Sequence, residues 1–221
     1  MELIFATANN HKISEASAIL GKSFTLIMPK DLGHPEDIPE TGTTLEENSM
    51  LKCRTVVKMF GRDCFADDTG LEVEALNGAP GVFSARYADN WNAPEEEMAE
   101  AVKAVASGEE MQIPLKYRMV MGRLLWELER MEKESEGANR RARFRTVITL
   151  YYKGEYHTFE GIVNGVITRK MLGSNGFGYD AVFMPDGYNC TIAQMTEEQK
   201  NAISHRSVAL HKLATFLKRE A

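Results

Sequence analysis

Two adjacent carboxylates, Asp67 and Asp68, follow a short apolar run in the stretch FADDTG. The run predicts a strand that ends in a turn, with Gly70 breaking the chain soon afterwards. Adjacent like charges repel, and a buried carboxylate is costly unless a cation or hydrogen bonds compensate its charge. Because binding sites form at strand ends in α/β sheets, this pair is the first candidate for a functional site.

Apolar runs alternate with helical spacings along most of the chain. Ile13, Ala16 and Leu20 recur on one face and predict a helix, which Gly21 ends. Strands are expected at 2–8, 63–68 and 70–76, and a further short strand after a Gly-rich loop at 173–180. A hairpin is expected to turn at Lys153–Glu155. Two further helices are expected: one begins with a capping box at Thr44–Glu47 and carries an apolar stripe of Cys53, Val56 and Phe60, and the other is C-terminal with Ala209, Leu213, Phe216 and Leu217 on one face. Strands mixed with helices predict an α/β protein.

The region at residues 89–143 reads as helical. Pro94 lies near the start of a helix with three glutamates in its first turn, where they favour the helix dipole. A second helix carries on one face Met121, Leu124, Leu125, Leu128 and Met131. The charge run at 133–143 predicts a solvated helix end and a loop. We interpret the region as a helical layer packed on the sheet of a single domain that covers residues 1–221.

Charge and apolar content restrict the partners of the protein. A net charge of −6 argues against broad electrostatic affinity for nucleic acid, although a local basic pocket for a small anion remains compatible with it. The cysteines Cys53, Cys64 and Cys190 are widely spaced, which indicates reduced thiols. No stretch approaches the roughly 20 apolar residues of a membrane span, and the stretch MELIFATANN lacks the basic flank and the long apolar run that are typical of a signal peptide. We therefore expect a cytoplasmic protein that binds neither nucleic acid nor membranes.

The turn between the first strand and the first helix, residues 7–12, is a candidate phosphate site. Free backbone N–H groups gather at the positive end of a helix dipole, and Lys12 adds a full positive charge. The GxxxxGK[ST] pattern of a Walker A loop is absent from the sequence. An ordinary capped helix start is the alternative.

A set of acidic residues offers the oxygen ligands that Mg²⁺ prefers. Its members are Glu40, Glu46, Glu47, Asp67 and Asp68. A metal held by one or two carboxylates and by substrate phosphates polarises a phosphoryl oxygen and activates water. Ordinary surface acids are the alternative, which the capping box favours for Glu46 and Glu47. The position after an apolar strand favours a site for the aspartate pair.

Two later stretches are candidates for binding a nucleotide. In the Gly-rich loop at 173–180, Phe177 and Tyr179 offer flat faces for a base, and Asp180 offers an acceptor. The alternative is a Gly-rich turn with aromatic core anchors. Further along the chain, Lys200, His205 and Arg206 are three potential cations, and capping by Ser204 places the last two in a helical first turn. This placement suits a bound anion, and a solvated basic turn is the alternative.

Together these stretches resemble one family, the noncanonical purine nucleoside triphosphate pyrophosphatases, or inosine triphosphatases. The matching segments, in family order, are FATANNHKISE, ETGTTLEENSMLKC, ADDTGLEVEALNGAPGVFSARYA, GSNGFGYDAVFMP and EEQKNAISHRSVALHKL. The resemblance covers much of the chain outside residues 89–143. It implies an elongated mixed central sheet flanked by helices, two lobes with a substrate cleft between them, and a homodimer.

The resemblance also implies a reaction. Water attacks the α-phosphorus of ITP, dITP or XTP, in the presence of Mg²⁺, and gives the nucleoside monophosphate and pyrophosphate. The cellular role is to clear deaminated purines from the nucleotide pool.

The resemblance assigns roles to particular residues. The triphosphate-binding turn corresponds to Thr7, Ala8, Asn9, Asn10, His11 and Lys12. Glu40 and Asp68 match the metal-linked acids, and Asp68 also matches the catalytic base, which leaves Asp67 to support the turn or the second shell of the metal. The remaining positions that match substrate contacts are Lys52, Thr69, Arg86, Phe177, Gly178, Tyr179, Asp180, Lys200, His205 and Arg206.

One departure and three rival functions accompany the resemblance. Around residues 93–116 the chain is longer than typical members, which predicts structural elaboration of the outer helical layer. A nucleotide-binding sensor that has lost turnover is the main alternative, and intact Lys12, Glu40 and Asp68 argue against it. A phosphotransferase would need a Walker-type or kinase-type loop, which the sequence lacks. The third rival function is hydrolysis of modified pyrimidine or canonical nucleoside triphosphates. Competition between substrates would distinguish it from hydrolysis of deaminated purine triphosphates.

Overall fold

The computed structural model describes residues 1–34, 38–134 and 139–220. Its strands are β1 (Glu2–Phe5), β2 (Thr25–Ile27), β3 (Cys64–Val73), β4 (Pro80–Gly81), β5 (Arg141–Tyr152), β6 (Glu155–Ile167) and β7 (Phe183–Pro185). Its α-helices are α1 (Asn10–Leu20), α2 (Leu45–Phe60), α3 (Glu95–Val105), α4 (Leu115–Glu134), α5 (Glu197–Ile203) and α6 (His205–Glu220), and its 3-10 helices include η5 (Gly108–Gln112). Within these residues, every helix is too short or too polar to cross a membrane.

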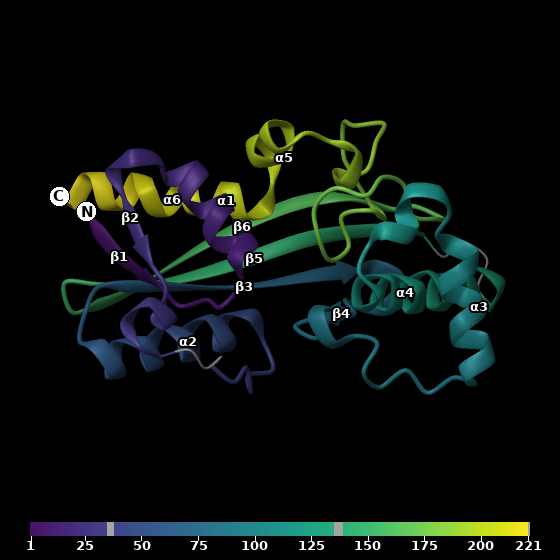
Figure 1. Cartoon of the computed structure of the whole chain (residues 1–221), viewed down its shortest axis with the longest axis horizontal. Coiled ribbons are helices and arrows are strands. Elements are labelled where there is room, and N and C mark those ends of the chain that lie inside the picture. Colours follow the sequence, from purple (N-terminus) through teal and green to yellow (C-terminus); the bar gives the residue numbers. More distant parts are fainter. Residues whose placement is uncertain (35–37, 135–138, 221) are drawn as a thin grey trace. The chain divides into compact units, whose positions relative to one another are not determined.

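The strands form one mixed sheet in the order β2-β1-β3-β5-β6-β7, and β4 pairs with β3 (Figure 1). β1 runs parallel to β2 and β3, whereas β4 is antiparallel to β3 and β7 is antiparallel to β6. Lys153 and Gly154, both with positive φ, form the two-residue turn from β5 to β6. The sheet and its flanking helices confirm the predicted α/β fold, including the hairpin.

The chain divides into two compact units. Unit 1 consists of Met1–Thr69, Arg145–Ile162 and Asn201–Ala221, and unit 2 of Gly70–Phe144 and Val163–Lys200. The two units are described separately below. The single domain and the substrate cleft expected from the sequence stay predictions.

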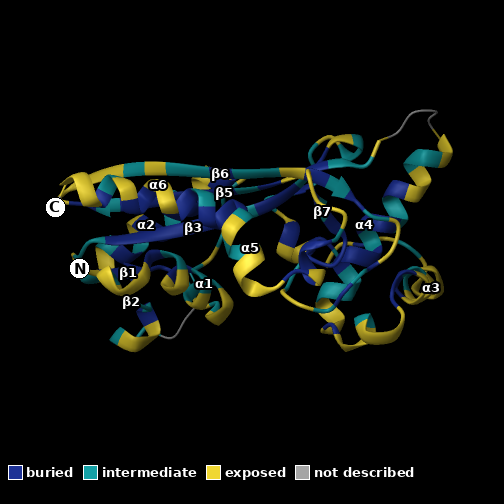
Figure 2. Cartoon of the chain, turned by 90° about the horizontal axis from the view of Figure 1, so that it is seen from above, coloured by how far each residue is buried: buried dark blue, intermediate teal, exposed yellow. Residues whose placement is uncertain are grey.

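In unit 1, alternate residues of the central strands point to opposite faces of the sheet, as the period of two in a strand requires. Phe5 and Phe65 stack with ring centroids 4.3 Å apart on the face covered by α1 and α6. Ile4, Cys64 and Ala66 lie on the face covered by α2. Figure 1 shows these helices on the two sides of the strands, and Figure 2 shows most of β3 in the dark blue of buried residues. The face of any β3 residue therefore follows from its place in the alternation.

Strand β3 corrects the sequence analysis. Cys64–Val73 form one strand of ten residues, where we expected a strand that ends in a turn and a second strand after it. Gly70 does not break the chain, because it lies in extended backbone against β4. A Cβ atom at Gly70 would lie 2.6 Å from the carbonyl oxygen of Gly81, so glycine is required by the close approach of two backbones. Asp67 and Asp68 consequently lie in the middle of a strand and not at its end.

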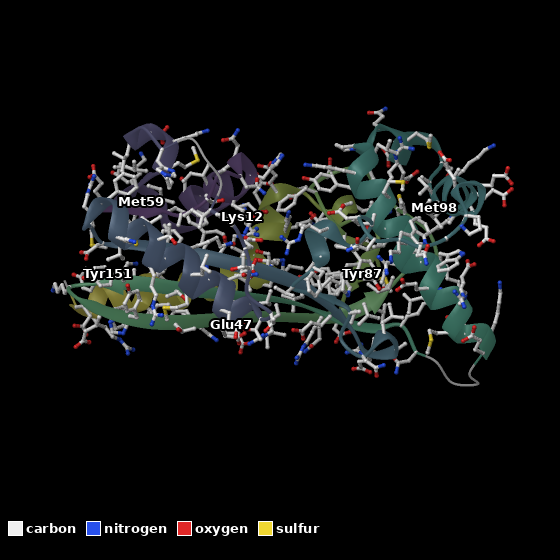
Figure 3. The ribbon with its side chains drawn as sticks, turned by 90° about the horizontal axis from the view of Figure 1, so that it is seen from below. Lys12, Glu47, Met59, Tyr87, Met98 and Tyr151 are labelled. Atoms are coloured by element: carbon white, nitrogen blue, oxygen red, sulfur yellow. The ribbon has the colours of Figure 1, made fainter. Side chains whose placement is uncertain are left out.

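In unit 2, α3 packs on α4, which supplies much of the apolar core. A Cβ atom at Gly122 of α4 would lie 2.7 Å from Cγ2 of Val102, so glycine permits the close contact of the two helices. Arg123 extends its guanidinium over the ring of Tyr87, which Figure 3 labels, at 4.2 Å from the ring centroid. The predicted apolar face of α4 is confirmed, with Met131 half-buried and four residues fully buried, namely Met121, Leu124, Leu125 and Leu128.

The charge run at 133–143 is only partly the solvated segment that we expected. Residues 135–138 lie outside the described residues. Arg141 and Arg143 belong to β5 and not to a loop, and they alternate along the strand with buried Ala142. The prediction of a loop was wrong for these arginines, because an exposed face of a strand carries charge as readily as a loop does.

Helix ends follow the sequence closely. α1 ends at Gly21, and the hydroxyl of Thr44 accepts a hydrogen bond from the backbone N–H of Glu47 at 3.1 Å to begin α2. The carboxylate of Glu47 accepts from the N–H of Thr43 at 2.7 Å, one residue before the position that a full capping box would use. Half of the predicted capping box is therefore present.

We expect Gly70→Ala to lower the free energy of unfolding by about 1–3 kcal/mol, because its Cβ has no room beside β4. Urea denaturation measures the loss. Gly61→Ala is the control, since Gly61 meets open space and alanine there adds only the cost of positive φ, about 1 kcal/mol. A smaller loss for Gly70→Ala than for Gly61→Ala would contradict the close approach of β3 and β4.

Candidate active site

The two central aspartates point to opposite faces of the sheet. Asp67 shares its face with Phe65, on the side of α1 and α6, and Asp68 shares its face with Ala66, on the side of α2. Both are buried, with 1% and 6% of their surfaces exposed, respectively. The strand therefore separates two carboxylates that are adjacent in sequence, and each meets its own set of partners.

Asp67 is held by two cations. Nζ of Lys12, from α1, lies 2.7 Å from its Oδ1, and Nε of Arg206, from α6, lies 3.1 Å from its Oδ2. Arg206 also pairs with Glu15 of α1. Burial alone would raise the pKa of Asp67, but the charges of Lys12 and Arg206 hold it well below the usual 3.8. Asp67 is therefore an ionised carboxylate whose charge the protein itself balances.

This ion-pair cluster of Lys12, Glu15, Asp67 and Arg206 excludes one alternative and corrects one interpretation. The basic turn is not solvated, since His205 and Arg206 are 7% and 2% exposed. Asp67 does not support a turn, because β3 continues through it. The cap was predicted correctly, since the hydroxyl of Ser204 accepts from the N–H of Ser207 at 3.1 Å. The carboxylates of Glu15 and Asp67 are anions that the start of α6 binds.

Asp68 meets a different environment on the α2 side. Its Oδ2 accepts from Nδ2 of Asn48 at 3.1 Å, and its Oδ1 accepts from the N–H of Thr69 at 2.9 Å. Nζ of Lys52 stands 3.8 Å from the same Oδ1 and 2.5 Å from Oε1 of Glu40. Burial raises the pKa of Asp68, Lys52 opposes that rise, and the negative charge of Glu40 adds to it. The ionised form of Asp68 is therefore less well compensated than that of Asp67.

The donor set around Asp68 suits a hard divalent cation. Two carboxylates, those of Glu40 and Asp68, flank a single lysine amine, so negative charge exceeds positive charge at this point. Among the described residues, no cluster holds three or more His, Cys, Asp or Glu side chains suited to a metal. Mg²⁺ needs only one or two carboxylates when phosphates and water complete its octahedron. The residues fit a cation that binds together with a phosphorylated ligand.

The remaining acids bond to other groups of the protein, and side chains of the turn cap the start of α1. Glu46 pairs with Arg145, and Glu47, labelled in Figure 3, bonds to the backbone before α2, so the surface interpretation of both glutamates is confirmed. Asn9 caps α1 by accepting from the N–H of His11 at 2.9 Å, and the hydroxyl of Thr7 accepts from the N–H of Asn9 at 3.1 Å. Part of the predicted phosphate-binding turn is thus occupied by its own side chains.

A chain of hydroxyl groups links Thr69 to His205. Oγ1 of Thr69 lies 2.7 Å from Oγ1 of Thr146, which in turn lies 2.5 Å from Nδ1 of His205. Thr146 is fully buried, so these bonds fix the rotamers of its two partners. The chain connects the residue after Asp68 with the start of α6.

The predicted site residues of unit 2 form a separate cluster. Oδ2 of Asp180 accepts from the N–H of Phe177 at 3.0 Å and from Nζ of Lys200 at 2.9 Å. The Lys200 amine also lies 4.7 Å from the ring centroid of Phe177. Tyr179 is a core anchor, since it is buried and its hydroxyl donates to the carbonyl of Ser84 at 2.9 Å. The Gly-rich loop therefore orders its own aromatic and charged side chains.

The structure groups the predicted site residues by unit. Unit 1 contains residues 7–12, Glu40, Lys52, Asp68, Thr69, His205 and Arg206, and unit 2 contains Arg86, Phe177, Gly178, Tyr179, Asp180 and Lys200. Arg86 is exposed, with its guanidinium 6.0 Å from the ring centroid of Phe83.

Three residues at the site were missed by sequence reasoning. Glu15 follows Lys12 by three positions and Asn48 precedes Lys52 by four, so helical spacing alone sets each beside a predicted residue. Thr146 carries no such signal, because its partners come from a different strand and a distant helix.

Comparison with known proteins gives one family. The model of the Ham1 family matches residues 3–123 and 116–216, two pieces that overlap at the start of α4. A curated dITP/XTP pyrophosphatase of Flavobacterium psychrophilum is 42% identical over 218 residues, which cover 99% of this chain and 100% of that protein. The dITP/XTP pyrophosphatase of Porphyromonas gingivalis is 42% identical over 98% of this chain and 97% of its own.

Solved structures agree with the sequence matches. A HAM1 protein from Coxiella burnetii superimposes with a TM-score of 0.79 at 33% identity, covering 99% of both chains. The Ham1 protein of Staphylococcus aureus gives a TM-score of 0.75 at 35% identity and covers 100% of both chains.

We expect Asp67→Asn to lower the free energy of unfolding by about 3–5 kcal/mol, because it leaves Lys12 and Arg206 buried without their shared carboxylate. Asp186→Asn is the control, since that carboxylate pairs with Arg141 at an exposed site and should cost less than about 1 kcal/mol. Urea denaturation near pH 7 measures both variants.

The same experiment at lower pH tests the charge of Asp67. Its pKa is lowered on folding, so its stabilisation is present above the usual value of 3.8 and is lost as the pH falls below it. The difference in stability between the wild type and Asp67→Asn should therefore shrink below about pH 4. A difference that is small at neutral pH, or that stays constant on acidification, would contradict the assignment.

Proposed function

This chain belongs to the Ham1 family, and we propose that its site performs the reaction for which its relatives are named. It is a hydrolase that converts deaminated purine nucleoside triphosphates, ITP, dITP and XTP, to the nucleoside monophosphate and pyrophosphate. The environment of Asp68 supports this proposal most directly. A buried carboxylate beside a lysine and a second carboxylate suits attack of water on the α-phosphorus of a triphosphate, with cleavage of the phosphoanhydride bond to the β-phosphate.

Asp68 acts on the attacking water in this proposal. Asn48 and the N–H of Thr69 fix the plane of the carboxylate from two directions, so one rotamer presents its oxygens. Burial raises its pKa, which makes it a better proton acceptor than an exposed aspartate. Asp68 thus orients the water and accepts its proton.

Glu40 and Asp68 would hold a divalent cation, which we propose is Mg²⁺. When bound, the cation neutralises phosphate charge and polarises the phosphoryl oxygen. Lys52 lies between the two carboxylates and contributes a cation to the same phosphates. Lys12 and the turn at 7–12 lie at the start of α1, where N–H groups favour further phosphate oxygens.

The base and sugar would meet the residues that the family resemblance assigns to them. Phe177 offers a flat face, and Lys200 and Asp180 set donors and acceptors beside it. The resemblance assigns to the same ligand His205, Arg206, Arg86, Gly178 and Tyr179, of which Arg206 is bonded to Asp67 and Glu15 and Tyr179 is buried in the core of unit 2. Donors aimed at the 6-oxo group of hypoxanthine or xanthine would accept these bases over adenine. A cytoplasmic homodimer that cleanses the nucleotide pool accords with this substrate class.

The direct test is release of pyrophosphate from ITP, XTP, dITP, GTP and ATP in parallel, with Mg²⁺ and with a chelator. We expect strong release from ITP, XTP and dITP, little from GTP and ATP, and none with the chelator. Equal release from all five would contradict the proposed base discrimination. Tight binding of XTP without release would favour a nucleotide sensor over a hydrolase.

We expect Asp68→Asn to lower kcat by a factor of about 100 or more, because the amide accepts no proton. Its stability should be unchanged or higher, since burial disfavours the charge that the substitution removes. Kinetics and urea denaturation measure the two effects. Glu46→Gln is the matched control, an exposed acid of the same unit that should leave kcat unchanged. Near-normal turnover of Asp68→Asn would contradict the assignment.

A further inference from the structure

The segment between α3 and α4 is bonded to the start of the Gly-rich loop 173–180. The backbone N–H of Met171 donates to the carbonyl of Val105, the last residue of α3, at 2.8 Å. Two residues later, the N–H of Gly173 donates to Oε1 of Glu110, in η5, at 3.0 Å. All four residues lie in unit 2. The helical region thus contacts the loop at two points, one through the backbone and one through a side chain.

The position of Gly173 makes this contact consequential. Gly173 has a φ of 81°, and a Cβ atom there would lie 2.7 Å from the carbonyl oxygen of Ala193, so the backbone has little room to move on that side. On the other side, Oε1 of Glu110 accepts a hydrogen bond from the backbone N–H of Gly173. The loop therefore begins at a residue that is held between two elements.

The same loop carries Phe177 and Asp180, two members of the cluster proposed to bind the base, and Lys200 of α5 is the third. Asp180 accepts from the N–H of Phe177, and Lys200 bonds to Asp180 and lies over the ring of Phe177. The backbone returns to the loop base through a hydrogen bond from the N–H of Leu172 to the carbonyl of Ala181, at 2.8 Å. A shift at Gly173 would therefore change the position of the aromatic face.

Glu110 itself is fixed by the core on both sides of it in sequence. Val105 and Ala106 precede it, Ile113 follows it, and all three pack with Met171 in one apolar cluster. Glu110 is half-buried, whereas the neighbouring Glu109 is exposed. A carboxylate held in this way is a stronger acceptor for an N–H group than water that exchanges freely.

We propose that Glu110 is a positioning residue for the base-binding loop, and that the segment between α3 and α4 thereby sets the affinity for the purine. The inference rests on the proposed function, since it assigns a role within the same site. The segment lies within residues 3–123, the first of the two stretches that the family model matches. The affinity for XTP thus depends on a residue outside the cluster of Phe177, Asp180 and Lys200.

The test compares Glu110→Ala, Glu110→Asp and Glu110→Gln with the wild type, and Glu109→Ala is the matched control. KM and kcat for XTP, the Kd for XTP measured by calorimetry on Asp68→Asn carrying each change, and hydrogen exchange of the peptide around residues 170–181 are the readouts. Glu110→Ala should raise KM and Kd about tenfold with kcat within about twofold, because it removes the hydrogen bond to Gly173. Exchange at 170–181 should become faster.

The other variants separate the hydrogen bond from charge and from folding. Glu110→Gln keeps an acceptor oxygen and should restore KM to within about threefold of the wild type, whereas Glu110→Asp keeps the charge, withdraws the acceptor, and should resemble alanine. Glu109→Ala should change nothing. Unaltered KM, Kd and exchange in Glu110→Ala would overturn the inference. If the wild type released no pyrophosphate, the proposed hydrolysis would fail, while Kd and exchange would still decide the role of Glu110.

Discussion

The alternation of side chains along β3 is the constraint on which the site depends. Asp67 and Asp68 are adjacent, and in a turn their charges would have shared one environment. In a continuous strand they point to opposite faces, so the sheet itself lies between their carboxylates. One face then supplies Lys12 and Arg206, and the other supplies Asn48 and Lys52. A single backbone geometry thus gives two identical side chains different chemistry.

The two faces differ in how completely charge is balanced. Around Asp67, two carboxylates meet two cations, so the charge sums to zero and the cluster is a structural link between α1, α6 and the sheet. Around Asp68, two carboxylates meet one lysine, so a negative charge is left over. Buried charge without a partner is unfavourable, and a bound cation would relieve it. In the proposed function this imbalance favours cation binding on the α2 side, whereas the ion pairs on the other side link α1 and α6 to the sheet.

The local sequence pattern predicted most helices and strands, and it failed where contacts between residues distant in the chain determine the structure. The helices at α1, α2, α4 and α6 follow from apolar spacing and end signals, because these depend on neighbours in sequence. Gly70 was expected to break the chain, yet glycine is required at this position because the backbone of β4 approaches it closely. The placement of Arg206 suited a bound anion, yet the anion that it binds is the carboxylate of Asp67, which lies 139 residues away in the chain. The family resemblance supplied candidate roles, but the assignment of each aspartate to a face required β3 as a single strand.

The same reasoning explains why Glu110 escapes sequence analysis. It lies in an acidic stretch between two helices, where glutamates usually meet water, and its partner is a backbone N–H group 63 residues further on. Only the core contacts of Val105, Ala106 and Ile113 bring this stretch against the loop. A segment that packs on the core can therefore influence a neighbouring loop through one hydrogen bond from a side chain.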